Sequence, residues 1–121
     1  IKIFEIEDVV ELTDELEAKA CNKKHLAILI SDTKANYTQI KSCVEYLFGA
    51  LNLGIRITRE FHKSFIEGRC AAIYFNDKKI GVMGELHPEV LLNFGLTIPT
   101  VAAEIDMSEV LGWRAKEVEW A

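Results

Sequence analysis

Two apolar runs on either side of a short polar turn constrain the fold of this chain more than any other feature. Residues 70–75 and 80–86 have the length and apolar content of β-strands, and Asn76-Asp77-Lys78 follows the first run with residue types typical of a tight turn. Strands joined this closely pair in the antiparallel sense, so the pattern predicts a β-hairpin. Any sheet that contains this hairpin is at least partly antiparallel.

The remaining segments predict an α+β domain, in which a mainly antiparallel sheet carries helices on one side. Apolar residues recur every three or four positions from Tyr37 to Leu51, which indicates a helix of about four turns that stops at Gly54. A second, short helix is expected to begin at Pro88 and to end at Gly95. We expect further strands at residues 2–10, 25–31, 55–60 and 100–107, and irregular chain at residues 12–24, 61–68 and 96–99.

Composition excludes several classes of protein. The 121 residues are 50% hydrophobic and 27% charged, and no apolar run approaches the roughly 20 residues of a membrane helix. The formal net charge of −5 argues against a domain that grips nucleic acid, because phosphate backbones require a positive surface. The chain starts inside a predicted strand without a signal-peptide pattern, from which we expect a piece of a longer cytoplasmic protein.

The cysteine and basic residues suggest structural roles. Cys21, Cys43 and Cys70 form no C-x-x-C pair, so the usual zinc and redox motifs are missing, and the last two are expected to fill the core. One basic cluster is interrupted by acidic residues and is interpreted as a solvated surface with ion pairs. It consists of Arg56, Arg59, Lys63 and Arg69.

Glu85, His87 and Glu89 form an E-x-H-x-E cluster of the kind that can bind a metal or transfer protons. Pro88, however, turns the chain and separates Glu89 from the other two residues. We therefore interpret His87 as a structural residue that binds backbone donors where the short helix starts. A catalytic role for Glu85 and His87 together with Arg69 is the alternative.

The spacing of the glycines and arginines also bears on nucleotide binding. Gly81 and Gly84 are spaced G-x-x-G without the residues of a phosphate loop, so we expect them to allow close approach of a helix or a partner subunit. Arg69 is expected either to bind an anion or to pair with a glutamate. An adenylate site would need Arg56, Arg59 and Arg69 to converge, and their spacing does not indicate that they do.

Several stretches occur in a distinctive order along the chain. They are K-I-F-E-I-E-D-V-V at residues 2–10, F-I-E-G-R-C-A-A-I at 65–73, I-G-V-M-G-E-L-H-P-E-V-L at 80–91, N-F-G-L-T-I-P at 93–99 and A-E-I-D-M at 103–107. Their order resembles the beta subunits of the phenylalanyl-tRNA synthetase family, of the archaeal and eukaryotic type. The resemblance covers nearly the whole chain up to Leu111.

The resemblance implies a fold and a role. It implies that residues 1–111 are a class II synthetase catalytic-like domain without the catalytic motifs, followed by a tail at residues 112–121. The first helix and strand of the class II core would precede Ile1, which would leave an exposed sheet edge. The family's enzyme is an α2β2 heterotetramer that charges phenylalanine-specific tRNA with the use of ATP and magnesium, and its active site lies on the alpha subunit.

For this chain the resemblance implies packing against the alpha subunit and assigns no catalytic, cofactor-binding or metal-binding residue. Aromatic residues are enriched at the centres of interfaces, so four of them are candidate anchors, although an ordinary core role is favoured for each. These are Phe61, Phe65, Phe94 and Trp113. The alternatives are a stand-alone interaction domain of the same fold, and a small hydrolase or transferase that uses Glu85, His87 and Arg69.

Overall fold

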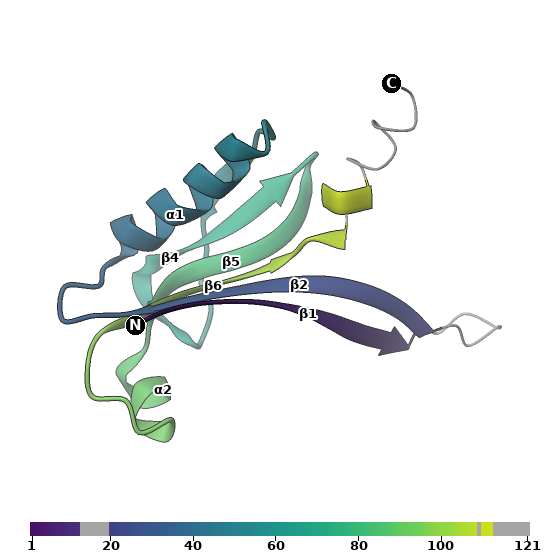
Figure 1. Ribbon diagram of the computed structural model, residues 1–121. Helices are drawn as coiled ribbons and strands as arrows, with labels where there is room; N and C mark the ends of the chain where they lie inside the picture. The colour runs from purple at the N-terminus through teal and green to yellow at the C-terminus, as the bar shows by residue number, and fades with distance from the viewer. Residues whose placement is uncertain (13–19, 109, 113–121) are drawn as a thin grey trace.

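A computed structural model describes residues 1–12, 20–108 and 110–112, with the backbone alone at residues 7–12 and 20–23. Within these residues the chain forms one six-stranded sheet in the order β1-β2-β6-β5-β4-β3, and every neighbouring pair is antiparallel (Figure 1). The strands are β1 (Lys2–Leu12), β2 (Ala20–Ser31), β3 (Arg56–Arg59), β4 (Phe65–Phe75), β5 (Lys78–Leu86) and β6 (Thr100–Asp106); the helices are α1 (Tyr37–Ala50) and α2 (Pro88–Asn93). The predicted α+β class with a mainly antiparallel sheet is confirmed.

The predicted hairpin is formed by β4 and β5. Its turn consists of Asn76 and Asp77, with φ angles of 51° and 63°. Two successive residues with positive φ match the right-handed twist of the strands that they join, and Asn and Asp tolerate this conformation better than other side chains that have a Cβ. Lys78, which was expected in the turn, already belongs to β5.

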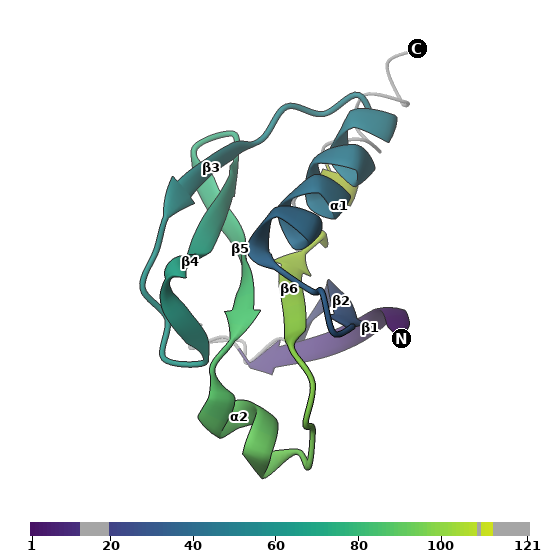
Figure 2. The same cartoon turned by 90° about the vertical axis from the view of Figure 1, so that its left-hand side faces the viewer.

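Helix α1 covers one face of the sheet over β5 and β6 (Figure 2). Ile40, Val44 and Phe48 form its buried stripe, as the spacing predicts. The side chain of Asn36 caps the helix by accepting a hydrogen bond of 3.0 Å from the backbone N–H of Gln39. The helix ends before the expected Gly54, because Asn52 takes the left-handed conformation, with φ 57°, and ends it at Ala50.

Helix α2 does not cover a face of the sheet, which corrects the expectation that both helices lie on one side. It connects β5 to β6 and lies beyond the ends of these strands (Figures 1 and 2). Pro88 occupies its first turn and Gly95 follows it with φ 69°, so the predicted start and stop residues are both used. No helix in the described part of the chain is long and apolar enough to cross a membrane.

The prediction of irregular chain at residues 12–24 is wrong at Leu12 and at residues 20–24, which extend β1 and β2; residues 13–19 lie outside the described residues. The pairing of β2 with β6 ends at His25 and Asp106, whereas the pairing with β1 continues to Ala20. Beyond β6 the two strands form a ribbon with little sheet beside it. Apolar and polar residues alternate along a strand because one face of the sheet is buried. Beyond the core this alternation is not required, so the sequence does not indicate a strand there.

The prediction of irregular chain at residues 61–68 is wrong from Phe65 onward, where β4 begins. The register of β4 against β5 shifts between Phe65 and Cys70, and Gly68 has a φ of 82°. Such a β-bulge adds residues to one strand and interrupts the alternation of its side chains. The strand is therefore continuous in space although its apolar pattern is broken.

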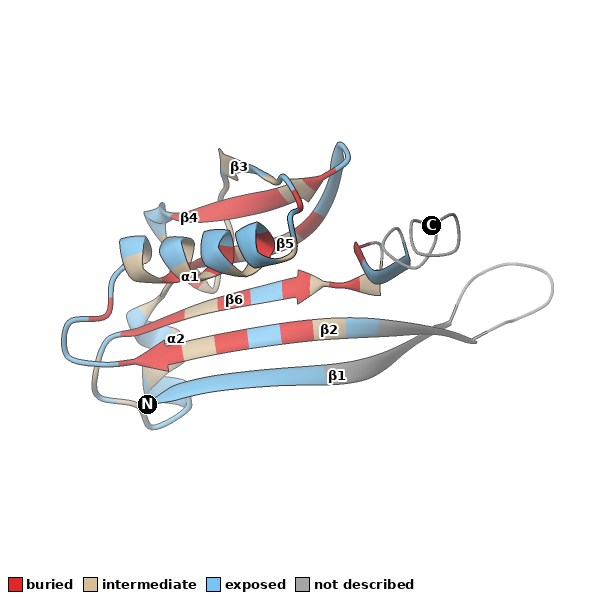
Figure 3. Ribbon diagram, turned by 45° about the horizontal axis from the view of Figure 1, so that its top comes forward, coloured by how far each residue is buried: buried red, intermediate tan, exposed pale blue. Residues whose placement is uncertain are grey.

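Burial follows the sheet pairing (Figure 3). Along β2, Leu26, Ile28 and Ile30 are buried, and the first two lie opposite Ile6 and Phe4 of β1. Phe4 and Ile6 are nevertheless 60% and 67% exposed, because β1 is an edge strand. The tail predicted at residues 112–121 lies outside the described residues except for Gly112.

Candidate functional site

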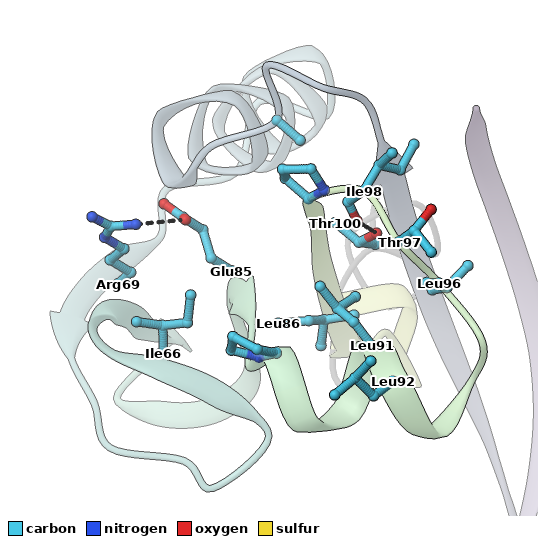
Figure 4. Close-up of a pocket in the computed structure, with 13 residues that line it drawn as sticks. Ile66, Arg69, Glu85, Leu86, Leu91, Leu92, Leu96, Thr97, Ile98 and Thr100 are labelled. Carbon is cyan, nitrogen blue, oxygen red and sulfur yellow. Dashed lines mark hydrogen bonds and ion pairs between the residues drawn. The ribbon is translucent and has the colours of Figure 1, made fainter.

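A cleft of about 560 Å³ lies between β5, α2 and the loop that leads into β6 (Figure 4). Aliphatic side chains line most of it, including Ile66, Leu86, Leu91 and Ile98. Arg69 and Glu85 lie together at one end of the cleft, and the leucines of α2 lie at the other. We call this the Arg69–Glu85 cleft. An apolar hollow with a few polar groups is the usual first candidate for a ligand site.

Both oxygens of the Glu85 carboxylate accept hydrogen bonds within the protein. Its Oε1 accepts a hydrogen bond of 3.1 Å from Nη1 of Arg69, and its Oε2 accepts one of 3.0 Å from the backbone N–H of Tyr37. The Glu85 side chain is 15% exposed and that of Arg69 is 59% exposed. The predicted ion pair of Arg69 is confirmed, and through it Glu85 ties β4 and β5 to the first residue of α1, where the helix dipole favours a negative charge.

Replacing Glu85 with glutamine should therefore lower the free energy of unfolding by about 1–3 kcal/mol, the range expected for hydrogen bonds to a charged group. The glutamine amide keeps one acceptor oxygen, but its NH2 group would face one of the two donors, either Arg69 or the backbone N–H of Tyr37. Urea unfolding at neutral pH measures the effect. Glu67→Gln, at an exposed position of β4, is the matched control and should change stability by less than about 0.5 kcal/mol. Equal effects of the two substitutions would show that the Glu85 contacts contribute nothing.

His87 caps helix α2, as predicted for a structural histidine. Its Nδ1 accepts a hydrogen bond of 3.1 Å from the backbone N–H of Glu89, and its own backbone N–H donates to the carbonyl oxygen of Ser64 at 2.9 Å. His87 lines a different hollow, with Phe61 and Phe65, and not the Arg69–Glu85 cleft. The structure thus brings Arg69 and Glu85 together but leaves His87 apart from them. The E-x-H-x-E cluster does not converge on one point.

Gly81 and Gly84 allow a close approach, but the approaching atoms are not those that we expected. A Cβ at Gly81 would meet the carbonyl oxygen of Glu104 in β6. A Cβ at Gly84 would lie 2.5 Å from the carbonyl oxygen of Arg69 in β4. Neighbouring strands, rather than a packed helix or a partner subunit, therefore require glycine at both positions.

The arginines that an adenylate site would need are dispersed. The Arg56 guanidinium lies over the ring of Tyr74, with its central carbon 4.6 Å from the ring centroid. Arg59 lines a small hollow beside α1, Arg69 lines the Arg69–Glu85 cleft, and Lys63 lines the hollow beside His87. The four residues of the predicted basic cluster thus lie at separate places and do not form one phosphate-binding site.

Two cysteines act as core residues, as predicted. Cys70 is buried and Cys43 is half-buried, and both are free thiols. Burial raises the pKa of the Cys70 thiol, and the negative charge of Glu60 raises it further. A raised pKa leaves little thiolate at neutral pH, so Cys70 is a poor nucleophile. The Cys21 side chain lies outside the described residues.

Magnesium requires several oxygen ligands around one point. In the part of the chain that the structure describes, no three His, Cys, Asp or Glu side chains gather in this way. The described residues therefore do not fit the magnesium that the family resemblance implies for the whole enzyme, and we assign no ligand to it.

The four candidate interface anchors differ in exposure. Phe65 is a buried core residue, which is the role that the sequence favoured for it, whereas Phe61 and Phe94 are 70% and 77% exposed; Trp113 lies outside the described residues. The exposure of apolar side chains on β1 was not predicted, because apolar residues occur on both faces of this edge strand. Among them, Phe4 and Ile6 line an apolar groove of about 540 Å³ together with Leu26, Leu47, Met107 and Leu111.

Comparisons with known proteins give a consistent result. Residues 1–107 match the family described as phenylalanyl tRNA synthetase beta chain CLM domain. The phenylalanine–tRNA ligase beta subunit of Methanopyrus kandleri is 38% identical over 116 residues, and that of Saccharolobus solfataricus is 37% identical over 110 residues. These alignments cover 93% and 91% of this chain but 20% of each relative, so the chain spans about a fifth of the length of the curated relatives that it matches.

A similar fold occurs in the solved structure of Desulfitobacterium hafniense PylSc, a pyrrolysyl tRNA synthetase. The TM-score is 0.66 at 14% sequence identity, and the alignment covers 96% of this chain and 42% of that one. At this identity the likeness concerns the fold alone.

Proposed function

The chain belongs to the phenylalanyl-tRNA synthetase beta chain CLM domain family, and from this premise we propose that it is a structural domain of a phenylalanine–tRNA ligase beta subunit. In this role it supports the charging of phenylalanine-specific tRNA by packing against a catalytic alpha subunit in a cytoplasmic heterotetramer. ATP and magnesium act elsewhere in that assembly. The likeness of its fold to a pyrrolysyl-tRNA synthetase supports a class II catalytic-like domain.

One observation carries the packing role. The edge strand β1 exposes apolar side chains on both of its faces, with Ile3 48%, Phe4 60% and Ile6 67% exposed. An open strand edge with apolar side chains is prone to pair with other chains, and proteins normally protect it. A neighbouring subunit that covers β1 would remove this apolar surface from water.

The state of the polar residues supports a role without catalysis. Glu85 uses both carboxylate oxygens to hold Arg69 and the start of α1, and His87 uses its Nδ1 to cap α2. A general base must reach the proton that it removes, and these groups are held by the protein itself. The contacts of Glu85 and His87 therefore favour a structural role over the role of a hydrolase or transferase.

An assay of ATP–pyrophosphate exchange with phenylalanine tests the non-catalytic role. The 121-residue chain alone should give no exchange above background, whereas the complete enzyme of alpha and beta subunits should give it. Robust exchange by the chain alone, lost in Glu85→Gln, would instead support the stand-alone enzyme.

A further inference from the structure

A small hollow of about 260 Å³ lies beside the first half of α1, between this helix, β3 and the bulge of β4. Its lining shares no residue with the Arg69–Glu85 cleft. Two of its side chains are cations, Lys41 from α1 and Arg59 from β3, and Tyr37 and Thr58 contribute hydroxyl groups. The cations are far apart in the sequence, and the packing of α1 beside the edge of the sheet brings them to one hollow.

Unlike Arg69 and Lys79, the two cations of this hollow have no acidic partner among the described residues. Arg69 pairs with Glu85 at 3.1 Å, and Lys79 pairs with Glu60 at 2.7 Å. Among the described residues, neither Lys41 nor Arg59 forms an ion pair or a hydrogen bond through its side chain.

The acidic residues Glu60 and Glu45 lie near the hollow but do not pair with its two cations. Glu60 follows Arg59 directly, but Lys79 binds its Oε2 and the backbone N–H of Phe61 binds its Oε1. These contacts hold the pKa of Glu60 below its ordinary value, with the Lys79 hydrogen bond as the largest cause. Glu45 lies one turn beyond Lys41 on α1 and is exposed. Among the described residues, Lys41 and Arg59 are therefore not engaged by an acid and can contact an external anion.

We propose that Lys41 and Arg59 bind a phosphate group in this hollow. A phosphate offers several acceptor oxygens and up to two negative charges, which suits two cations and the hydroxyls of Tyr37 and Thr58. A tyrosine hydroxyl is protonated and can donate a hydrogen bond at neutral pH, and burial raises the pKa of Tyr37 further. The phosphate belongs either to a small molecule or to an RNA backbone, which share this chemistry.

Titration of the 121-residue chain with inorganic phosphate, followed by the backbone amide resonances of Lys41, Thr58 and Gly68, tests the site. Ionic strength is held constant with chloride. Saturable shifts are expected in the unmodified chain, and the affinity should fall at least tenfold in the double variant Lys41→Gln/Arg59→Gln. The double variant Arg56→Gln/Lys63→Gln removes the same charge outside the hollow and should keep the affinity. Lys41→Arg preserves the charge and should also keep it.

Adenosine monophosphate and a short single-stranded RNA distinguish the sources. If the chain binds the RNA no more tightly than it binds adenosine monophosphate, the site is assigned to a small molecule. If it binds the RNA at least tenfold more tightly, the site is assigned to an RNA backbone. Linear shifts without saturation would overturn the proposal, as would equal losses in the two double variants, which would indicate general electrostatics only.

Discussion

Replacing Gly81 with alanine is expected to destabilise the fold by about 2–3 kcal/mol, the upper part of the range for overpacked interiors. The added Cβ would overlap the carbonyl oxygen of Glu104 and lie 3.0 Å from Cα of Ile105, both backbone atoms of β6. Backbone atoms in a central pair of strands cannot rotate away, so β5 and β6 must separate locally. The midpoint of urea unfolding, at unchanged slope, measures the loss.

Gly49 provides the matched control for this substitution. It lies in α1, and a Cβ at this position would meet nothing within 4 Å. Gly49→Ala should therefore raise the stability by up to about 1 kcal/mol, because alanine favours the helix. The same substitution should therefore lower the free energy of unfolding at Gly81 and raise it at Gly49. A neutral Gly81→Ala would mean that β5 and β6 are not paired this closely.

Replacing Phe48 with alanine is expected to cost about 3–5 kcal/mol, the range for large-to-small substitutions in a core. Phe48 is 1% exposed and lies in the stripe with which α1 packs on the sheet. Domains of this size are stable by roughly 5–15 kcal/mol in total, so the variant should lose a large part of its stability. Chemical denaturation followed by circular dichroism measures it.

Tyr46 lies on the same helix and is 80% exposed, so Tyr46→Ala should change the stability by less than about 0.5 kcal/mol. Similar costs for the two aromatic residues would refute the packing of α1 against β5 and β6.

The elements that the sequence predicts correctly have local signals. The Asn76-Asp77 turn, the apolar stripe of α1 and the His87-Pro88 corner each involve residues that are close in sequence and have specific backbone preferences. The full lengths of β1, β2 and β4 could not be predicted in this way. Backbone hydrogen bonds hold a ribbon or a bulged strand together, and these bonds leave no pattern in the side chains.

An ion pair at Arg69 could be predicted from the sequence, but the residue that completes it could not. An acidic partner for Arg69 was expected from composition, but Glu85 becomes that partner only because β4 and β5 pair. The convergence of Lys41 with Arg59 depends on where α1 lies on the sheet, which the sequence does not specify. Likewise, the exposure of Phe4 and Ile6 follows from the position of β1 at the sheet edge.

In its proposed role this domain binds a phenylalanine–tRNA ligase alpha subunit through β1. Co-purification of the chain with that subunit tests it most directly, in the unmodified form, in Phe4→Glu/Ile6→Glu, and in Tyr46→Glu, which alters an exposed aromatic residue of α1. We expect a stable complex for the unmodified chain and for Tyr46→Glu, and at least tenfold weaker association for the β1 variant. No association with the alpha subunit, or association that the β1 charges leave unchanged, would contradict the proposed role.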